Sequence, residues 1–253
     1  MKIAVCVKAV PDAASGRRLD EGSKRLDRSG ELAVSDFDTH AVEEALRVRE
    51  AAGGGEVIVV SLGPERAADA LRKTLAMGAD RSVLVSDDAF AGADLLVTAR
   101  ALTAVLDRES PDLVLFGQQS ADGDGACLWA AVAELWRRPV ISQVSELVVA
   151  DGAATGKRQT EYGYERVRAP LPVVVAVSDA INEPRYPSLK GIMGAKSKPQ
   201  EVLSAADVGP TGEARTTVLG IAAPPARGEG RKVEDEGDAA AAIVEFLAER
   251  RML

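Results

Sequence analysis

The chain of 253 residues has a formal net charge of -8, and 46% of its residues are hydrophobic. This length and apolar content suffice for one large α/β domain or two small ones. The acidic balance excludes a general nucleic-acid surface, which needs concentrated basic charge. A single histidine leaves little basis for a histidine metal site.

The two cysteines, Cys6 and Cys127, lie far apart in the sequence and are expected to be reduced thiols. Cys6 falls in an apolar strand pattern, which predicts an inert thiol in the core. The apolar run at residues 3–7 is too short for the hydrophobic part of a secretion signal. No apolar run approaches the roughly 20 residues of a membrane span. We therefore expect a cytoplasmic protein with no membrane insertion.

The first half of the chain alternates strand and helix patterns. Short, nearly continuous apolar runs predict buried strands at residues 2–7, 56–61, 82–86 and 112–116. Apolar residues at helical spacing predict helices from Asp36 or Asp38, as the N-cap, to residue 52, and at 63–77, 93–106 and 126–136. The alternation predicts an α/β fold with a doubly wound, mostly parallel sheet and helices on both faces.

Two regions depart from this alternation. Residues 8–32 are polar and turn-rich, which predicts a long loop with a short hairpin around 26–32. The region near 142–170 carries short alternating runs separated by Asp151-Gly152 and Tyr162-Gly163. That pattern predicts antiparallel strands added to one edge of the main sheet.

The last quarter of the chain predicts one more buried strand, at residues 172–177, and then less regular structure. Residues 182–199 are basic, contain proline and have little periodicity. The tail from 201 to 253 is rich in glycine and proline before an amphipathic helix at 239–251. We expect a single α/β domain over residues 1–200 and a C-terminal extension over 201–253.

The loop from Gly117 to Gly125 is the first candidate site, because it follows a buried strand and precedes a helix. Ligands of open α/β sheets bind beyond the carboxyl ends of the strands. Glycines let the backbone approach a phosphate, and the helix N-terminus presents N–H groups to it. The alternative is an ordinary loop whose aspartates cap the next helix.

Two further loops are candidates for the same pocket. The loop Val7–Asp12 follows the first strand, and the small side chain of Ala9 would let an adenine ring lie against the backbone. The stretch Ser35–Asp38 precedes the first helix and would border a nucleotide. The alternatives are an ordinary loop for the first and helix capping for the second.

The segment 182–199 is a candidate docking surface. Pro184 and Pro187 restrict its backbone, and it is basic within an acidic chain. Apolar residues lie in a stretch too broken for a core helix. An apolar anchor inside a basic rim suits protein docking; the alternative is a surface loop with solvated lysines.

Several catalytic patterns are missing from the sequence. It contains no Gly-x-x-x-x-Gly-Lys-[Ser/Thr], Gly-x-Ser-x-Gly or Cys-x-x-Cys motif. His40 is the only histidine, so a Ser-His-Asp triad has no support. It is interpreted as a polar residue in the first turn of a helix. We therefore expect no catalytic side chains.

Taken together, these motifs resemble the beta subunits of electron-transfer flavoproteins over residues 1 to about 250. The resemblance rests on their order and spacing. Its marks are Val5-Cys6-Val7-Lys8-Ala9-Val10-Pro11-Asp12, Ala41-Val42-Glu43-Glu44-Ala45, Ala70-Leu71-Arg72-Lys73-Thr74-Leu75-Ala76-Met77-Gly78-Ala79-Asp80, Gly117-Gln118-Gln119-Ser120-Ala121-Asp122-Gly123-Asp124 and Asn182-Glu183-Pro184-Arg185-Tyr186 with Ile192-Met193-Gly194-Ala195-Lys196.

The resemblance implies two groups of site residues. A pocket for AMP, or for a second FAD in electron-bifurcating members, would be formed by Ala9, Ser35, Asp36, Phe37, Asp38, Leu62, Gln119, Ser120, Asp122, Gly123, Asp124, Gly125, Ala126, Cys127 and Leu128. A recognition loop, anchored by Leu189, would dock partner proteins through Arg185, Tyr186, Pro187, Ser188, Leu189, Lys190, Ile192, Met193 and Lys196.

The resemblance also implies partners and a function. An alpha subunit would form a heterodimer with this chain, carry most of the contacts to the redox FAD, and receive the C-terminal extension. The pair would carry electrons from acyl-CoA or other flavin dehydrogenases, as in fatty acid beta-oxidation, to a quinone oxidoreductase. One alternative is a bifurcating subunit that takes electrons from NADH. Another, of a different class, is a stand-alone nucleotide-binding module of the universal-stress type, which shares the architecture.

One motif departs from the family pattern. Many members continue Asp-Gly-Asp with Thr-Gly-Gln or Thr-Ala-Gln, whereas this chain has Gly125-Ala126-Cys127-Leu128-Trp129. Two side-chain donors toward a phosphate are therefore replaced, and a bulky Trp129 follows. Whether AMP, FAD or nothing occupies the pocket stays open at the level of the sequence.

Overall fold

The computed structural model covers residues 1–253 and describes all but 13, 15, 17, 223–224, 227–229, 231, 233 and 235–236. The described residues divide into two compact units, Met1–Leu219 and Gly220–Leu253. The second unit contains the helix α7 (Ala239–Glu249), which has no buried residue within the described chain. The sheet and the candidate sites lie in the first unit.

The centre of the first unit is a nine-stranded sheet in the order β11-β10-β9-β12-β8-β1-β6-β7-β13. Its parallel core consists of β1 (Lys2–Cys6), β6 (Glu56–Leu62), β7 (Arg81–Val85), β8 (Leu113–Gly117) and β12 (Val173–Val177). The strand β1 pairs with both β6 and β8, so it lies in the middle of the sheet. The predicted mostly parallel sheet is confirmed.

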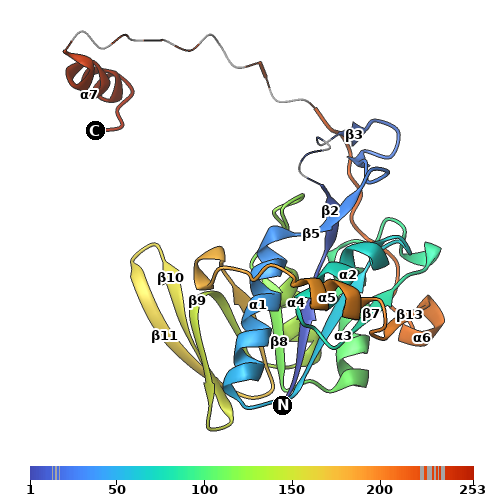
Figure 1. The fold of residues 1–253 in the computed structure, drawn as a ribbon. Coiled ribbons are helices and arrows are strands. Elements are labelled where there is room, and N and C mark those ends of the chain that lie inside the picture. The colour runs from blue at the N-terminus through green and yellow to red at the C-terminus, as the bar shows by residue number, and fades with distance from the viewer. Residues whose placement is uncertain are drawn as a thin grey trace. The chain divides into compact units, whose positions relative to one another are not determined.

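Helices cover both faces of this sheet (Figure 1). One face packs against α1 (Asp36–Ala51) and α2 (Ala67–Met77), and the other against α3 (Leu95–Glu109) and α4 (Leu128–Trp136). The alternation of side chains along β1 shows why both faces are covered: Ile3 and Val5 enter the first core, and Ala4 and Cys6 the second. Burial raises the pKa of the Cys6 thiol, in keeping with an inert core thiol.

An antiparallel extension forms one edge of the sheet, as predicted for residues near 142–170. It consists of β9 (Val140–Ala150), β10 (Ala153–Thr160) and β11 (Gly163–Pro170). The strand β9 joins it to the core by pairing in parallel with β12. At the other edge lies β13 (Gln200–Leu203), which pairs with β7 and was not predicted.

The sheet and the compact unit therefore continue past residue 200, where the sequence analysis expected the domain to end. The short helix α6 (Ala205–Val208) follows β13 and packs against α3. Residues 209–219 belong to the same unit. The role expected for the extension, contact with a partner subunit, stays a prediction.

Two local predictions near the N-terminus were wrong. The short hairpin lies at β3 (Leu19–Asp20) and β4 (Arg25–Leu26), not around 26–32. Instead β5 (Leu32–Val34) pairs with β2 (Ala9–Pro11), because this pairing buries Val34 in the core. The N-cap of α1 is Ser35, whereas Asp36 and Asp38 lie within its first turn.

Three short helices complete the element list. They are η2 (Asp88–Phe90), η3 (Asp179–Ile181) and α5 (Leu189–Ala195). The last two lie at or near the segment 182–199, which was expected to lack regular structure. The helix α5 packs against α2 (Figure 1), so the sheet, α1 and α2 form a fixed base for that segment.

Candidate functional site

A cavity of about 440 Å³ lies at the carboxyl ends of β1, β6 and β8. From β1 the chain moves to β6 and β7 on one side, and then returns to β8 on the other. The order of strands therefore reverses between β1 and β8, which is where open α/β sheets bind ligands. The volume falls within the range of small-molecule sites.

About half of the sequence-predicted pocket residues line this cavity. They are Ala9, Asp38, Leu62, Gln119, Ser120, Gly123, Gly125 and Leu128. The other members of that prediction, which lie outside the lining, are Ser35, Asp36, Phe37, Asp122, Asp124, Ala126 and Cys127. The three candidate loops do meet at one place, and their side chains divide between lining the cavity and holding the loops together.

Sequence reasoning missed a large part of the lining. The missed members include Arg25, Arg28, Phe90, Leu95, Leu102 and Trp129. Phe90 and Leu102 come from η2 and α3, whose helical apolar patterns are indistinguishable in sequence from ordinary core positions. Arg25 and Arg28 belong to the turn-rich region 8–32, where no periodicity indicates which side chains turn inward. Only their charge, in an acidic chain, was a usable signal.

Asp38 joins the ends of two central strands. Its buried carboxylate accepts hydrogen bonds from the backbone N–H groups of Lys8 at 2.7 Å and Gly117 at 3.2 Å. Burial raises the pKa of Asp38 to about 7, against the opposing effect of these hydrogen bonds. Gly117 is required at this junction, since a Cβ there would lie 2.6 Å from Asp38 Oδ1 and from the Phe37 carbonyl carbon. Asp38 is thus a structural link as well as a lining residue.

Ser35 has a similar linking role. Its buried side chain makes no cap hydrogen bond to α1. Its hydroxyl instead accepts a hydrogen bond from the backbone N–H of Ala121 at 3.1 Å. The stretch 35–38 therefore holds the loop that follows β8, and Ser35, although it occupies the N-cap position of α1, does not cap the helix with its side chain.

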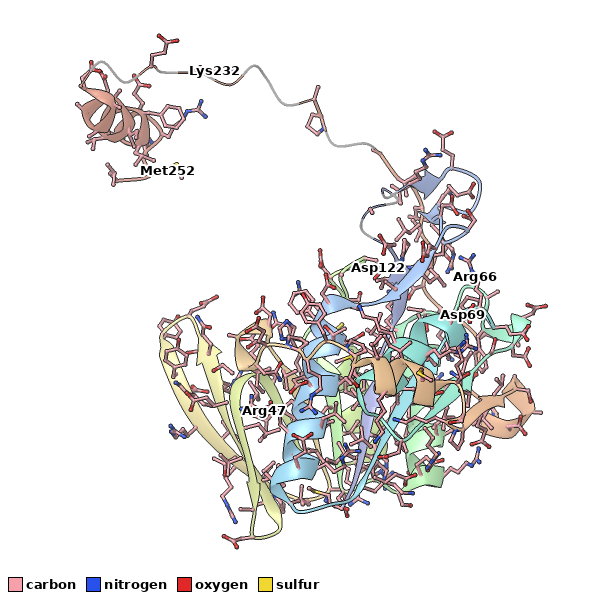
Figure 2. The ribbon with its side chains drawn as sticks, in the orientation of Figure 1. Arg47, Arg66, Asp69, Asp122, Lys232 and Met252 are labelled. Carbon is pink, nitrogen blue, oxygen red and sulfur yellow. The ribbon has the colours of Figure 1, made fainter. Side chains whose placement is uncertain are left out.

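Asp122 is a second enclosed acidic side chain at the site. Its side chain is 1% exposed and forms ion pairs with Lys8, at 2.8 Å, and with Arg28. Burial alone would raise the pKa of Asp122, but the hydrogen bonds and charges of Lys8 and Arg28 outweigh it and hold the pKa below its ordinary value. Asp122 lies at the carboxyl end of the sheet (Figure 2). Two cations against one carboxylate leave an excess positive charge beside the cavity.

The segment that departs from the family pattern forms the entry to α4. Asp124 adopts a left-handed conformation, with φ of 48°, and Cys127 is the exposed N-cap of α4. The indole N–H of Trp129 donates to the Gln118 carbonyl at 3.0 Å. Trp129 therefore forms part of the cavity wall and does not block the cavity. The helix α4 begins directly after this segment, and the N-terminus of a helix favours an anion.

The segment 182–199 presents an apolar surface, which we call the docking cluster: Tyr186, Leu189, Ile192 and Met193. Tyr186 is 93% exposed, Leu189 82% and Met193 76%. Leu189, Ile192 and Met193 lie on α5, and Tyr186 precedes it. Exposed large apolar side chains gathered in one segment mark an interaction site better than scattered ones. Lys190 and Lys196 are exposed on the same segment.

Arg185 fixes the start of this segment to α1. Its guanidinium donates to Glu43 at 2.8 and 3.0 Å and to Glu50 at 2.7 and 3.1 Å. The Glu43 side chain is only 7% exposed. The charge of Arg185 is therefore paired within the chain, and its expected part in docking a partner stays a prediction. The acidic helix α1 beside it provides the reason for the pairing.

Three further contacts hold the docking segment. Asn182 donates to the carbonyl of His40 and to Glu44, each at 3.0 Å. The ammonium of Lys198 donates to carbonyls at the end of α2, those of Leu75 and Ala79. At Gly191 an added Cβ would lie 2.3 Å from the Ala76 carbonyl oxygen, so the backbones of α5 and α2 touch. His40 also bonds to Asn182 through its ring, and so does more than occupy the first turn of α1.

The described residues contain neither a metal-holding cluster nor a membrane-spanning helix. Within them, no group of three or more histidine, cysteine or acidic side chains has an arrangement that could hold a metal ion. No helix in that part of the chain has the length and apolar character needed to cross a membrane.

The sheet order and the cavity at its switch point define a doubly wound α/β protein with a ligand-sized site beyond β1 and β8. The model of the electron transfer flavoprotein domain matches residues 24–208. The chain is 41% identical to the electron transfer flavoprotein subunit beta of Mycobacterium tuberculosis, over 99% of both chains. It is 36% identical to that of Syntrophomonas wolfei, over 95% of this chain and 93% of the relative.

The chain therefore belongs to the electron transfer flavoprotein family and, within it, to the beta subunits. Membership implies association with a flavin and pairing with an alpha subunit. A further relative is the subunit CarD of the caffeyl-CoA reductase-Etf complex of Acetobacterium woodii, 35% identical over the whole of both chains. The alternative of a stand-alone universal-stress-type module is set aside by this membership.

Proposed function

We propose that this chain is the nucleotide-holding and docking subunit of an electron-transferring heterodimer. In this proposal an alpha subunit holds most of the redox FAD, and the C-terminal extension 201–253 packs on it. The pair carries electrons from acyl-CoA or other flavin dehydrogenases to a quinone oxidoreductase. The chain itself contributes no catalytic side chain.

The observation that carries the proposal is the docking cluster on its fixed base. Leu189 and Met193 extend from α5 into solvent, while Arg185, Gly191 and Lys198 fix the backbone beneath them. A preorganised apolar contact needs little further ordering when a partner binds, so its small area suffices for transient association. An electron carrier needs that combination, since it must leave each partner after transfer.

The cavity supports the second half of the proposal. Its wall is partly apolar, at Leu62 and Phe90, and its edge is cationic, at Lys8 and Arg28. An apolar slot beside positive charge suits a base and phosphate on one ligand. We assign AMP to this cavity, held within this subunit.

The test replaces the proposed anchor, Leu189→Ala. The variant is paired with the alpha subunit, and electron transfer from a flavin dehydrogenase is followed under substrate-limited conditions. Loss of a central docking residue costs about 2 kcal/mol or more, so we expect the second-order rate to fall by about 30-fold with unchanged flavin content. Leu96→Ala is the matched control, because Leu96 is 46% exposed but belongs to α3, which covers the other face of the sheet from α2 and α5. Equal rates in the two variants would refute the docking role.

A second candidate function follows from the similarity to the CarD subunit named above. In that case the cavity holds a second FAD, and the heterodimer splits the electrons of NADH between two acceptors. Counting flavins separates the candidates. One flavin and one AMP per heterodimer supports the carrier, and two flavins without AMP supports bifurcation.

A further inference from the structure

We propose that Lys8 and Arg28, held in place by Asp122, form a phosphate subsite for an adenosine 5′-phosphate group at the edge of the cavity. The inference rests on the proposed function in so far as a nucleotide occupies this cavity. It adds which side chains read the phosphate. The segment 119–128, from which the resemblance implies nucleotide contacts, includes neither cation.

Lys8, Arg28 and Asp122 come from different parts of the chain. Lys8 leaves the end of β1, Arg28 follows the β3–β4 hairpin, and Asp122 follows β8, so three distant segments meet at one point. Lys8 Nζ lies 2.8 Å from Asp122 Oδ1 and 3.5 Å from Ser120 Oγ. Arg28 reaches the other carboxylate oxygen of Asp122. Lys8 and Arg28 both line the cavity, whereas Asp122 lies behind them.

The two cations are more exposed than the carboxylate that pairs with them. The Lys8 side chain is 43% exposed and that of Arg28 34%, while Asp122 is 1% exposed. The carboxylate is therefore enclosed, and both cations keep an accessible side. An ammonium has three donors and a guanidinium five, of which Asp122, Ser120 and the Leu26 carbonyl accept only some. The remaining donors are free to face a ligand from a fixed position.

Lys8 lies close to the loop that precedes α4. The space next to Gly123 that a side chain would fill lies 3.9 Å from Lys8 Nζ. Gly123 and Gly125 line the cavity just before α4, as Lys8 and Arg28 do, so this glycine-containing loop and both cations border the same cavity. In this chain the residues 125–127 are Gly, Ala and Cys, none of which supplies a strong side-chain donor. Lys8 and Arg28 provide the positive charge that a phosphate needs there.

The experiment titrates the purified full chain with AMP, adenosine and FAD by calorimetry, after removal of any retained nucleotide. In Arg28→Gln and Lys8→Gln we expect AMP binding to weaken by about 10-fold or more, the usual effect of losing a charge-assisted hydrogen bond. Adenosine binding should change by less than about twofold, because adenosine carries no phosphate. Arg28→Lys, which keeps the charge, should recover most of the AMP affinity.

The control is Arg66→Gln. Arg66, labelled in Figure 2 as Asp122 is, donates to the Ser29 carbonyl, next to Arg28 in sequence, but is not among the residues that line the cavity. That variant loses the same charge and should bind AMP as the unchanged chain does. A second readout is salt: AMP affinity should fall with ionic strength, and less steeply in Arg28→Gln.

FAD also contains an adenosine 5′-phosphate unit, there as part of a pyrophosphate, so the tighter of the AMP and FAD titrations identifies which nucleotide the subsite serves. Equal losses for AMP and adenosine would show that the three residues only hold the loops, and would overturn the proposal. No preference for AMP or FAD over adenosine in the unchanged chain would also overturn it. The docking function fails separately, through Leu189→Ala, without affecting these titrations.

Discussion

Replacing Gly191 by alanine tests whether the docking segment depends on its close contact with α2. The new Cβ would lie 2.3 Å from the Ala76 carbonyl oxygen and 3.4 Å from its carbon, whereas ordinary contacts of a Cβ begin at about 3.4 Å. The obstructing atoms are backbone, so α5 must move outward by about 1 Å. The docking cluster would move with it.

The magnitude follows from two opposed effects. Overpacking of this kind costs about 1–3 kcal/mol, while alanine in place of glycine within a helix contributes about 1 kcal/mol of stability. The net change in unfolding free energy should therefore be a loss of about 0–2 kcal/mol. Gly194→Ala in the same helix is the matched control, since nothing lies within 4 Å of its Cβ position. It should gain up to about 1 kcal/mol from helix propensity alone.

The assay has two parts: urea unfolding for stability, and electron transfer from a flavin dehydrogenase to the heterodimer for docking. We expect Gly191→Ala to be less stable than Gly194→Ala and slower in second-order transfer, with unchanged flavin content. If Gly191→Ala matched Gly194→Ala in both measurements, the contact between α5 and α2 would not position the docking cluster.

The other predictions concern two buried acids. The pKa of Asp38 is raised to about 7, above its unfolded value, so the folded state binds the extra proton between about pH 4 and 7. The free energy of unfolding should therefore decrease as pH rises through that window. Asp38→Asn should make the free energy of unfolding, measured by urea titration at pH 5 and 7, depend less on pH. An unchanged pH dependence would show that Asp38 is not its source. Arg185→Gln leaves Glu43 enclosed without its cation and should cost about 1–3 kcal/mol in urea unfolding. Arg72→Gln, from an exposed pair with Asp69, should cost below about 0.5 kcal/mol, and similar losses in both variants would refute the role of Arg185 in neutralising an enclosed carboxylate.

The strands that could be predicted are those whose own residues form a short apolar run. The core strands, of five to seven residues, are short apolar runs covered on both faces, so composition sufficed to place them. The strand β13 could not be found in this way, since Gln200 and Glu201 are polar and only Leu203 is buried. It becomes a strand because β7 offers an open edge, which is a tertiary cause.

For the candidate site, the sequence predicted which loops meet but not which way their side chains turn. Sequence order brought the loops at Ala9, Ser35 and Gln119 to one end of the sheet, because parallel strands share their carboxyl ends. It did not show which side chains face the cavity. Ser35 turns toward a backbone N–H, and Asp122 toward two cations, one of them 94 residues away. Pairings at that separation leave no periodic pattern in the sequence.

The docking segment shows that basic composition alone does not predict a free positive surface. A basic segment in an acidic chain was interpreted as a rim that steers partners, but the same acidic surroundings neutralise part of it. Arg185 is bound by Glu43 and Glu50, and Lys198 by helix-end carbonyls. Of the basic residues in this segment, only Lys190 and Lys196 are exposed. Recognition by this subunit should therefore rest more on the shape and apolar area around Leu189 than on long-range attraction, because exposed charges act mainly on the rate of encounter and are screened by salt.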